Sequence, residues 1–272
     1  MNSTLQRLAE IKKTGYTLDL GDTLNNIFSN YKNIALLGGL VILLVFIVAI
    51  VIFGGAAALF LGVNALTQTV TDYSEGVVTN TALILGFVAS TIGAGLFAPV
   101  VAGIIQMAHN SSINEDFDFG TAFMHYKSVH FKEIFLSAAL LTVIGSAAGL
   151  LIELYNLNNP NIGFQIVGNL ISNIFSALIQ IFTLLTIPLI IFGKLNAIEA
   201  IKGSFVLVSK NFWIILLLAI VCGLFVLLGL FALCIGILFT FPVIYSMQYV
   251  IYKSALPIDE ENELDEIGEN RF

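Results

Sequence analysis

The chain of 272 residues is 58% hydrophobic and only 11% charged, and its mean hydropathy is +0.95. Soluble domains carry about 25% charged residues, so this composition excludes a chain whose whole surface faces water and predicts an all-α, polytopic membrane protein. The net charge of −7 is concentrated near one end, because seven acidic residues lie between residues 259 and 269. We expect residues 254–272 to form an acidic, disordered cytoplasmic tail.

The first expected element is an amphipathic segment at residues 1–33, on the cytoplasmic side or in the membrane interface. Within it, LDLGDTLNNIFSNYKN (residues 18–33) places Leu24, Ile27 and Tyr31 on one helical face. Asp19 stands where an N-cap is needed, because its carboxylate can accept from the first free backbone N–H groups. The stretch therefore predicts an interfacial helix.

Six apolar segments follow. A helix needs about 20 residues to cross the roughly 30 Å hydrocarbon layer, and each segment is about that long or longer. We expect a transmembrane domain at residues 34–253, with spans at 34–62, 80–107, 133–155, 164–193, 211–229 and 231–252. The last two share one uninterrupted apolar stretch, in which Gly229 offers a turn.

The 11 lysine and arginine residues predict the orientation of these spans. All of them lie before the first span or after the second, fourth and sixth, whereas residues 63–79 and 156–163 contain none. Basic residues stay on the cytoplasmic side of a membrane, so both termini are expected in the cytoplasm.

An internal repeat is indicated by three similar segments. FDFGTAFMHYKSVHFK (residues 117–132), with Asp118 as its expected N-cap, and NAIEAIKGSFVLVSKN (residues 196–211) both resemble residues 18–33. A lysine near the end of each segment is expected to reach lipid phosphates as an interfacial anchor; the three are Lys32, Lys132 and Lys210.

The second span of each pair carries a proline, which removes one backbone hydrogen bond and is expected to kink the helix. The three are Pro99, Pro188 and Pro242. Matched prolines after matched amphipathic segments predict three diverged repeats, each consisting of an interfacial amphipathic helix and a helical hairpin.

Residues 196–253 resemble bacterial integral membrane proteins of the YciC type. The resemblance lies in a Ser-Phe pair followed by Lys-Asn-Phe-Trp, a glycine-containing hairpin, a threonine two residues before a proline, and a closing Tyr-Lys. Proteins of this type are similar to the membrane domain of some glycerophosphodiester phosphodiesterases. The resemblance implies six spans in the bacterial cytoplasmic (inner) membrane, and it implies no catalytic activity.

The fourth expected span carries polar residues at spacings of four and three, which puts them on one helical face. They are Asn169, Asn173, Ser176, Gln180 and Thr183. Unpaired amides facing lipid cost about 1–3 kcal/mol, so this polar stripe should face protein or water. Two interpretations stay open: a seam hydrogen-bonded to another helix, and the lining of a cavity for a polar solute or a lipid head group.

Few other residues of the chain could bind a metal or take part in catalysis. His109, His125 and His130 lie in or beside one cytoplasmic connection without the convergent spacing of a metal site. We therefore expect no metal, no cofactor and no enzymatic activity. The small residues Gly145 and Gly149 favour close helix packing, within the chain or with a partner.

The favoured hypothesis is a non-enzymatic scaffold or accessory subunit of a larger membrane or envelope complex. Its expected partners are membrane lipids and a second membrane protein or another copy of the chain, with no nucleic acid. The alternative is a transporter, channel or lipid-handling protein that uses a polar cavity lined by the fourth span.

Overall fold

The computed structural model describes residues 3–62, 67, 68, 71, 79–231, 236–256 and 258. Within this part of the chain, every regular element is helical. The expectation of an all-α fold is confirmed for these residues.

Five helical segments among the described residues are long and apolar enough to cross a membrane, which gives the chain the features of a multi-pass membrane protein. They correspond to the first five expected spans. The segments are Leu20–Ile52 in α2 (Leu20–Leu61), α4 (Asn80–Ser112), α6 (Phe131–Asn158), Ile162–Ile191 in α7 (Ile162–Phe182) and α8 (Thr186–Ile191), and Phe212–Phe231 in α10 (Phe212–Leu228) and the 3₁₀ helix η2 (Gly229–Phe231).

The sixth expected span, residues 231–252, includes residues 232–235, which lie outside the described residues. Its described part forms two helices, α11 (Gly236–Thr240) and α12 (Pro242–Ala255). Most of the expected tail at residues 254–272, with all of its acidic run, also lies outside the described residues.

No break in the helix marks the expected boundary at residue 33 between the interfacial segment and the first span. Residues on both sides of position 33 belong to the single helix α2 of 42 residues. The stretch contains no proline, and Gly38 and Gly39 do not interrupt the helix because their backbone hydrogen bonds continue. The N-terminal residues instead form a separate helix, α1 (Ser3–Thr14), which packs against α9 (Ala197–Lys210).

The other two expected interfacial helices differ from each other. Residues 197–210 form the full helix α9, whereas residues 117–132 form only α5 (Phe119–Phe123) and the 3₁₀ turn η1 (Met124–Tyr126) before α6 begins. Both predicted N-caps are confirmed: Asp19 accepts from the backbone N–H of Asp22 at 2.8 Å, and Asp118 accepts from that of Thr121 at 3.0 Å. The lysines proposed as anchors, Lys32, Lys132 and Lys210, are all exposed.

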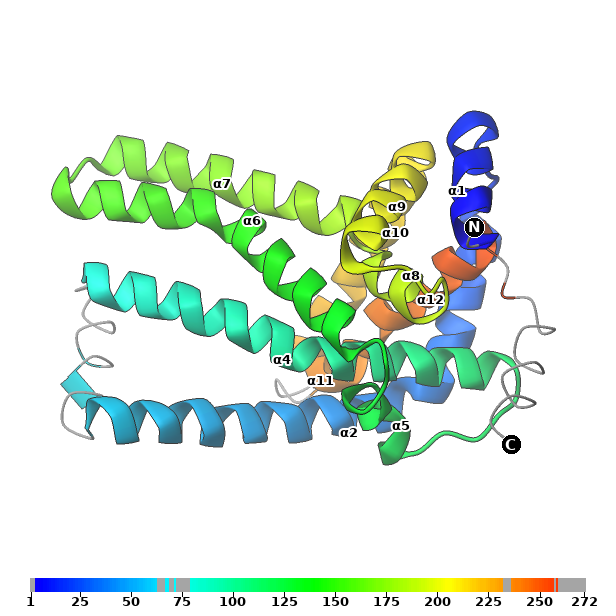
Figure 1. The fold of residues 1–272 in the computed structure, drawn as a ribbon, viewed down its shortest axis with the longest axis horizontal. Coiled ribbons are helices and arrows are strands. Elements are labelled where there is room, and N and C mark those ends of the chain that lie inside the picture. The colour runs from blue at the N-terminus through cyan, green and yellow to red at the C-terminus, as the bar shows by residue number, and fades with distance from the viewer. Residues whose placement is uncertain are drawn as a thin grey trace.

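Helices α2 and α4 run alongside each other, and α6 packs against both α4 and α7 (Figure 1). Helices α6 and α7 form an antiparallel hairpin. The shorter helices α1, α8, α9 and α12 gather toward one end of the long helices in this view. The ends of α1 and α9 lie close together, because the amide of Asn211 after α9 donates to the carbonyl of Tyr16 after α1 at 2.9 Å.

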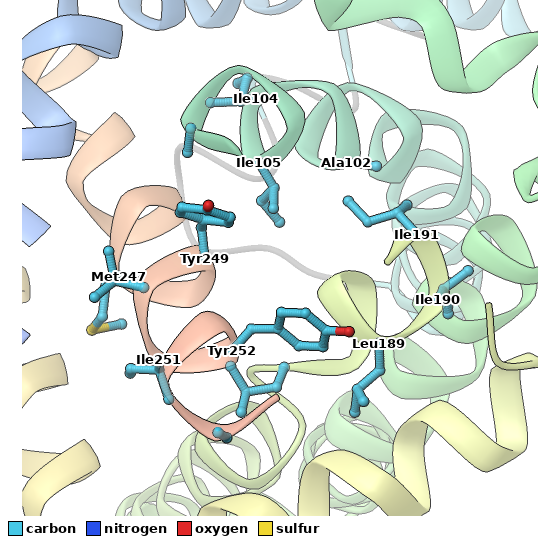
Figure 2. Packing of buried hydrophobic residues seen from close by; sticks show 14 of the residues in the cluster. Ala102, Ile104, Ile105, Leu189, Ile190, Ile191, Met247, Tyr249, Ile251 and Tyr252 are labelled. Carbon is cyan, nitrogen blue, oxygen red and sulfur yellow. The ribbon is translucent and has the colours of Figure 1, made fainter. Parts of the chain in front are cut away.

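The buried core lies where α4, α8 and α12 meet (Figure 2). Ile105 of α4, Leu189 of α8 and Tyr249 of α12 are each 0–1% exposed. Polar contacts join the same region, since Nδ1 of His109 lies 3.2 Å from the Tyr249 hydroxyl. Helices in a membrane associate through such close packing and a few hydrogen bonds, because lipid gives little hydrophobic drive between them.

Two of the three prolines expected to kink helices stand next to helix breaks. Pro188 is the third residue of α8, and Pro242 is the first residue of α12. Pro99 instead lies inside the continuous helix α4. The break before Pro188 is the one that shapes the candidate site.

Candidate functional site

A cavity of about 480 Å³ lies between α6, α7, α8 and α12. This volume falls in the range that binding sites for small molecules occupy. Eight of its 15 lining residues carry a hydroxyl or amide side chain: Ser137, Thr142 and Ser146 from α6, Ser176 and Gln180 from α7, Thr183 after α7, Thr186 from α8, and Gln248 from α12. None of the lining residues is charged.

The break between α7 and α8 places Thr183 and Thr186 at this cavity. Pro188 has no N–H to donate to the carbonyl of Leu184, so the regular helical ladder cannot continue there. The hydroxyl of Ser204 on α9 fills the gap: it accepts from the N–H of Leu185 at 3.0 Å and donates to the carbonyl of Phe182 at 2.8 Å. Because Ser204 is fully buried, this bridge holds the break in one conformation.

Most hydroxyls of the lining donate to a carbonyl of their own helix. Ser137 donates to Ile134 at 2.9 Å, and Thr142 donates to Ala138 at 2.8 Å. Ser146 and Thr183 make the same kind of bond one turn back. A hydroxyl that has used its proton in this way keeps its oxygen lone pairs, so these groups face the cavity as acceptors.

Thr186 differs from these residues. Its side chain is 2% exposed, and its Oγ1 has no hydrogen-bond partner among the described residues. The oxygen is itself buried, so it lies behind the surface of the lining and offers no hydrogen bond to a molecule in the cavity.

Exposure changes across the cavity from floor to mouth. Ser137 and Thr186 are buried, Ser176 and Gln248 are half-buried, and Gln180 is exposed. On α6, Ser137 lies six residues from the first residue of the helix, which is about 9 Å along its axis at 1.5 Å per residue. The cavity lies along α6 and the α7–α8 segment, which both have the length and composition of membrane spans.

Some residues of the polar stripe on the fourth span form a seam with another helix, and others line the cavity. Asn169 belongs to a seam, because its amide donates to Oε1 of Glu153 on α6 at 2.8 Å. Ser176 belongs to both, since its hydroxyl donates to the carbonyl of Gly145 and its side chain lines the cavity. Gln180 and Thr183 line the cavity. Asn173 is exposed and is not among the lining residues.

The small residues on α6 allow this seam to form. A Cβ atom on Gly149 would lie 3.7 Å from the hydroxyl of Ser172 on α7, which is ordinary contact distance. Gly149 therefore faces a neighbouring helix of the same chain, whereas a Cβ atom on Gly145 would meet nothing within 4 Å.

Sequence analysis missed part of the lining. Thr142 and Ser146, one helical turn apart in LLTVIGS, and Gln248 in the sixth expected span also line the cavity. The four-residue spacing on α6 was a usable signal, because it places both hydroxyls on one helical face. Gln248 gave none, because a lone glutamine in an apolar stretch has no periodicity.

The three histidines do not converge. His109 contacts Tyr249, whereas His125 is buried in η1 with no hydrogen-bond partner for either ring nitrogen among the described residues. Burial, and next the charge of His130, lower the pKa of His125 to about 4. Among the described residues, no group of three or more His, Cys, Asp and Glu side chains is placed to hold a metal ion.

No protein-family model, curated protein or solved structure matches this chain. The resemblance to YciC-type proteins therefore stays a prediction, and the candidate function rests on the geometry of the site.

Proposed function

We propose that this protein binds a polar or amphipathic molecule of the membrane in the cavity between α6, α7, α8 and α12, as a lipid-handling or transport protein without a catalytic centre of its own. The eight hydroxyl and amide side chains gathered in one uncharged lining are the observation that carries the proposal. A cavity that served only as a gap between packed helices would be lined by apolar groups, because unpaired polar groups at membrane depth are costly.

The shape of the site supports binding from the side. Its lining passes from the buried floor at Ser137 and Thr186 to the exposed amide of Gln180. A molecule that moves within the bilayer can reach such a mouth without crossing a water-filled channel.

The proposal favours the alternative drawn from the sequence over a scaffold or accessory subunit. Exposed apolar faces on α2, α4 and α7 suit contact with lipid as well as with a protein partner, so they do not by themselves support a scaffold. The cavity has a defined polar lining, and a scaffold does not need such a cavity.

The proposed topology has six spans, three diverged hairpins, and both termini in the cytoplasm of a bacterial cell. The position of lysines supports this orientation, because α1, α9 and α12 each carry lysine in their last turn and gather toward the same end of the long helices (Figure 1). Helix breaks beside Pro188 and Pro242 support a relation between the second and third hairpins. Under this topology, the cavity begins near the cytoplasmic end of α6.

The test is native mass spectrometry of the full chain, extracted gently from its own membrane, with every bound lipid, solute and protein counted per copy. We expect one defined small molecule per chain. The double variant Gln180→Leu with Thr142→Val should lose it, whereas Asn173→Leu, which changes an exposed amide of the same stripe outside the cavity, should keep it. A stoichiometric protein partner with no small molecule would support the scaffold instead.

A further inference from the structure

We infer that the cavity selects a membrane lipid with an uncharged, hydroxyl-bearing head group, such as a diacylglycerol, and rejects lipids whose head group carries a phosphate. This inference rests on the proposed function and names the class of molecule bound. It follows from the hydrogen-bonding character of the lining, from the absence of charge there, and from the apolar side chains of the lining.

The lining offers acceptors in excess. Four hydroxyls of the lining each donate a hydrogen bond to a carbonyl one turn back, at distances of 2.6–2.9 Å. They belong to Ser137, Thr142, Ser146 and Thr183. Their oxygens are left to accept. A ligand that fits must therefore donate hydrogen bonds, which an alcohol does and an ionised phosphate diester cannot do.

The remaining polar groups suit a hydroxyl as well. The amides of Gln180 and Gln248 carry one acceptor oxygen and two donor protons each. A ligand hydroxyl can donate to a serine or threonine oxygen of the lining and accept from one of these amides.

No charged side chain lines the cavity. The nearest ionisable residue along α6 is Glu133, one turn before Ser137, and its carboxylate accepts from the backbone N–H of Ala197 at 2.8 Å. A phosphate in the cavity would leave water without meeting a cation, and would approach this carboxylate as well. Burying an unpaired charge is strongly unfavourable, so charged head groups are disfavoured.

The apolar part of the lining points to a lipid as the source of the hydroxyl, in preference to a free polyol from water. Half-buried apolar side chains line the cavity beside its polar groups, among them Leu141 of α6, Ile179 of α7 and Ile187 of α8. Apolar side chains in the lining suit acyl chains that remain in the bilayer while the head group enters. A volume of about 480 Å³ holds a head group without the chains.

The inference is tested with the full chain in phosphatidylcholine nanodiscs that contain a trace of diazirine-bearing diacylglycerol. After illumination, labelled peptides are mapped, and labelling is competed with unlabelled diacylglycerol, with phosphatidate of the same acyl chains, and with free glycerol. Diacylglycerol and phosphatidate differ only in the phosphate on one oxygen, so the pair isolates the effect of charge.

We expect labels on α6, α7 and α12, competition by diacylglycerol, and at least about tenfold weaker competition by phosphatidate, which corresponds to a difference of about 1.4 kcal/mol. Free glycerol should not compete. Equal competition by phosphatidate would overturn the selectivity while the proposed function stands. Competition by glycerol would make a soluble polyol the ligand and overturn the lipid. No specific labelling and no bound molecule in the native protein would overturn both proposals.

A variant that gains a new lipid preference must be folded, so its result cannot be explained by misfolding. Gln180→Lys places a cation at the mouth, where it can pair with a phosphate. We expect it to shift the preference toward phosphatidate by about tenfold relative to the unchanged chain. Asn173→Lys, on the same helix but outside the cavity, should leave the preference unchanged. An equal shift in both variants would mean that general surface charge, and not the cavity, sets the preference.

Discussion

Thr186 and Thr240 each stand two residues before a proline at a helix break, yet only one of the two hydroxyls is satisfied. The hydroxyl of Thr240 lies 3.2 Å from the carbonyls of Val226, Gly236 and Ile237, whereas that of Thr186 is buried and has no partner among the described residues. The same local sequence pattern therefore gives a bonded hydroxyl in one place and an unpaired one in the other.

This difference predicts opposite effects of the same substitution. Thr186→Val removes an unpaired hydroxyl at nearly constant volume, so stability in lipid-free detergent should stay the same or rise. Thr240→Val removes a bonded hydroxyl and should lower the free energy of unfolding by about 1 kcal/mol. Thermal unfolding in detergent measures both, and a clear loss at Thr186 would show that its hydroxyl is bonded within the protein.

The seam between α6 and α7 gives a second prediction. Asn169→Leu removes the donor that pairs with Glu153, so the free energy of unfolding should fall by about 1 kcal/mol, as for other hydrogen bonds between membrane helices. Asn173→Leu is the matched control, because its amide is exposed on the same helix. If both variants lost the same stability in detergent, the Asn169–Glu153 contact would not be what holds the hairpin.

Close packing of α4 against α5 gives a third prediction. A Cβ atom on Gly103 would overlap the carbonyl oxygen of Ala122, and backbone cannot give way as a flexible side chain can. Gly103→Ala should therefore destabilise the protein by about 1–3 kcal/mol. Gly86→Ala lies on the same helix with nothing within 4 Å, and it should be neutral or stabilising because alanine favours a helix over glycine. Comparing the two melting temperatures separates packing from helix propensity.

The buried imidazole of His125 gives a fourth prediction, on pH. Its pKa is about 4 in the folded protein, whereas an unfolded chain titrates near the ordinary value of 6.5, so the unfolded state binds more protons between these values. The stability contributed by neutral His125 is complete above pH 6.5 and is lost as the pH falls toward 4. The slope should reach about 1 kcal/mol per pH unit.

His125→Phe should flatten this part of the stability profile, because the apolar ring fills the site without a titrating group. His130→Asn should keep most of the slope, since burial is the main cause of the shift at His125. Chemical unfolding of the detergent-solubilised chain across pH 4–7 would measure how the free energy of unfolding changes with pH in each variant. An unchanged slope in His125→Phe would assign the pH dependence to other groups.

The sequence by itself determined that this protein is suited to a lipid bilayer, and it determined several local features. An excess of apolar residues leaves too few charges to face water, and uninterrupted apolar runs predict where helices cross the bilayer. The caps at Asp19 and Asp118 were predictable as well, because a capping bond joins residues three apart in the chain. Such features need no knowledge of which helix lies beside which.

Only the tertiary structure decided what the polar stripe does. Periodicity places Asn169, Ser176 and Gln180 on one face of a helix, but the partner of that face belongs to other segments of the chain. Glu153 happens to meet Asn169, and the break held by Ser204 opens the space that Gln180 lines. Whether a buried polar group becomes a seam or a site depends on the distance to its neighbours, and that distance is set by packing between segments far apart in sequence.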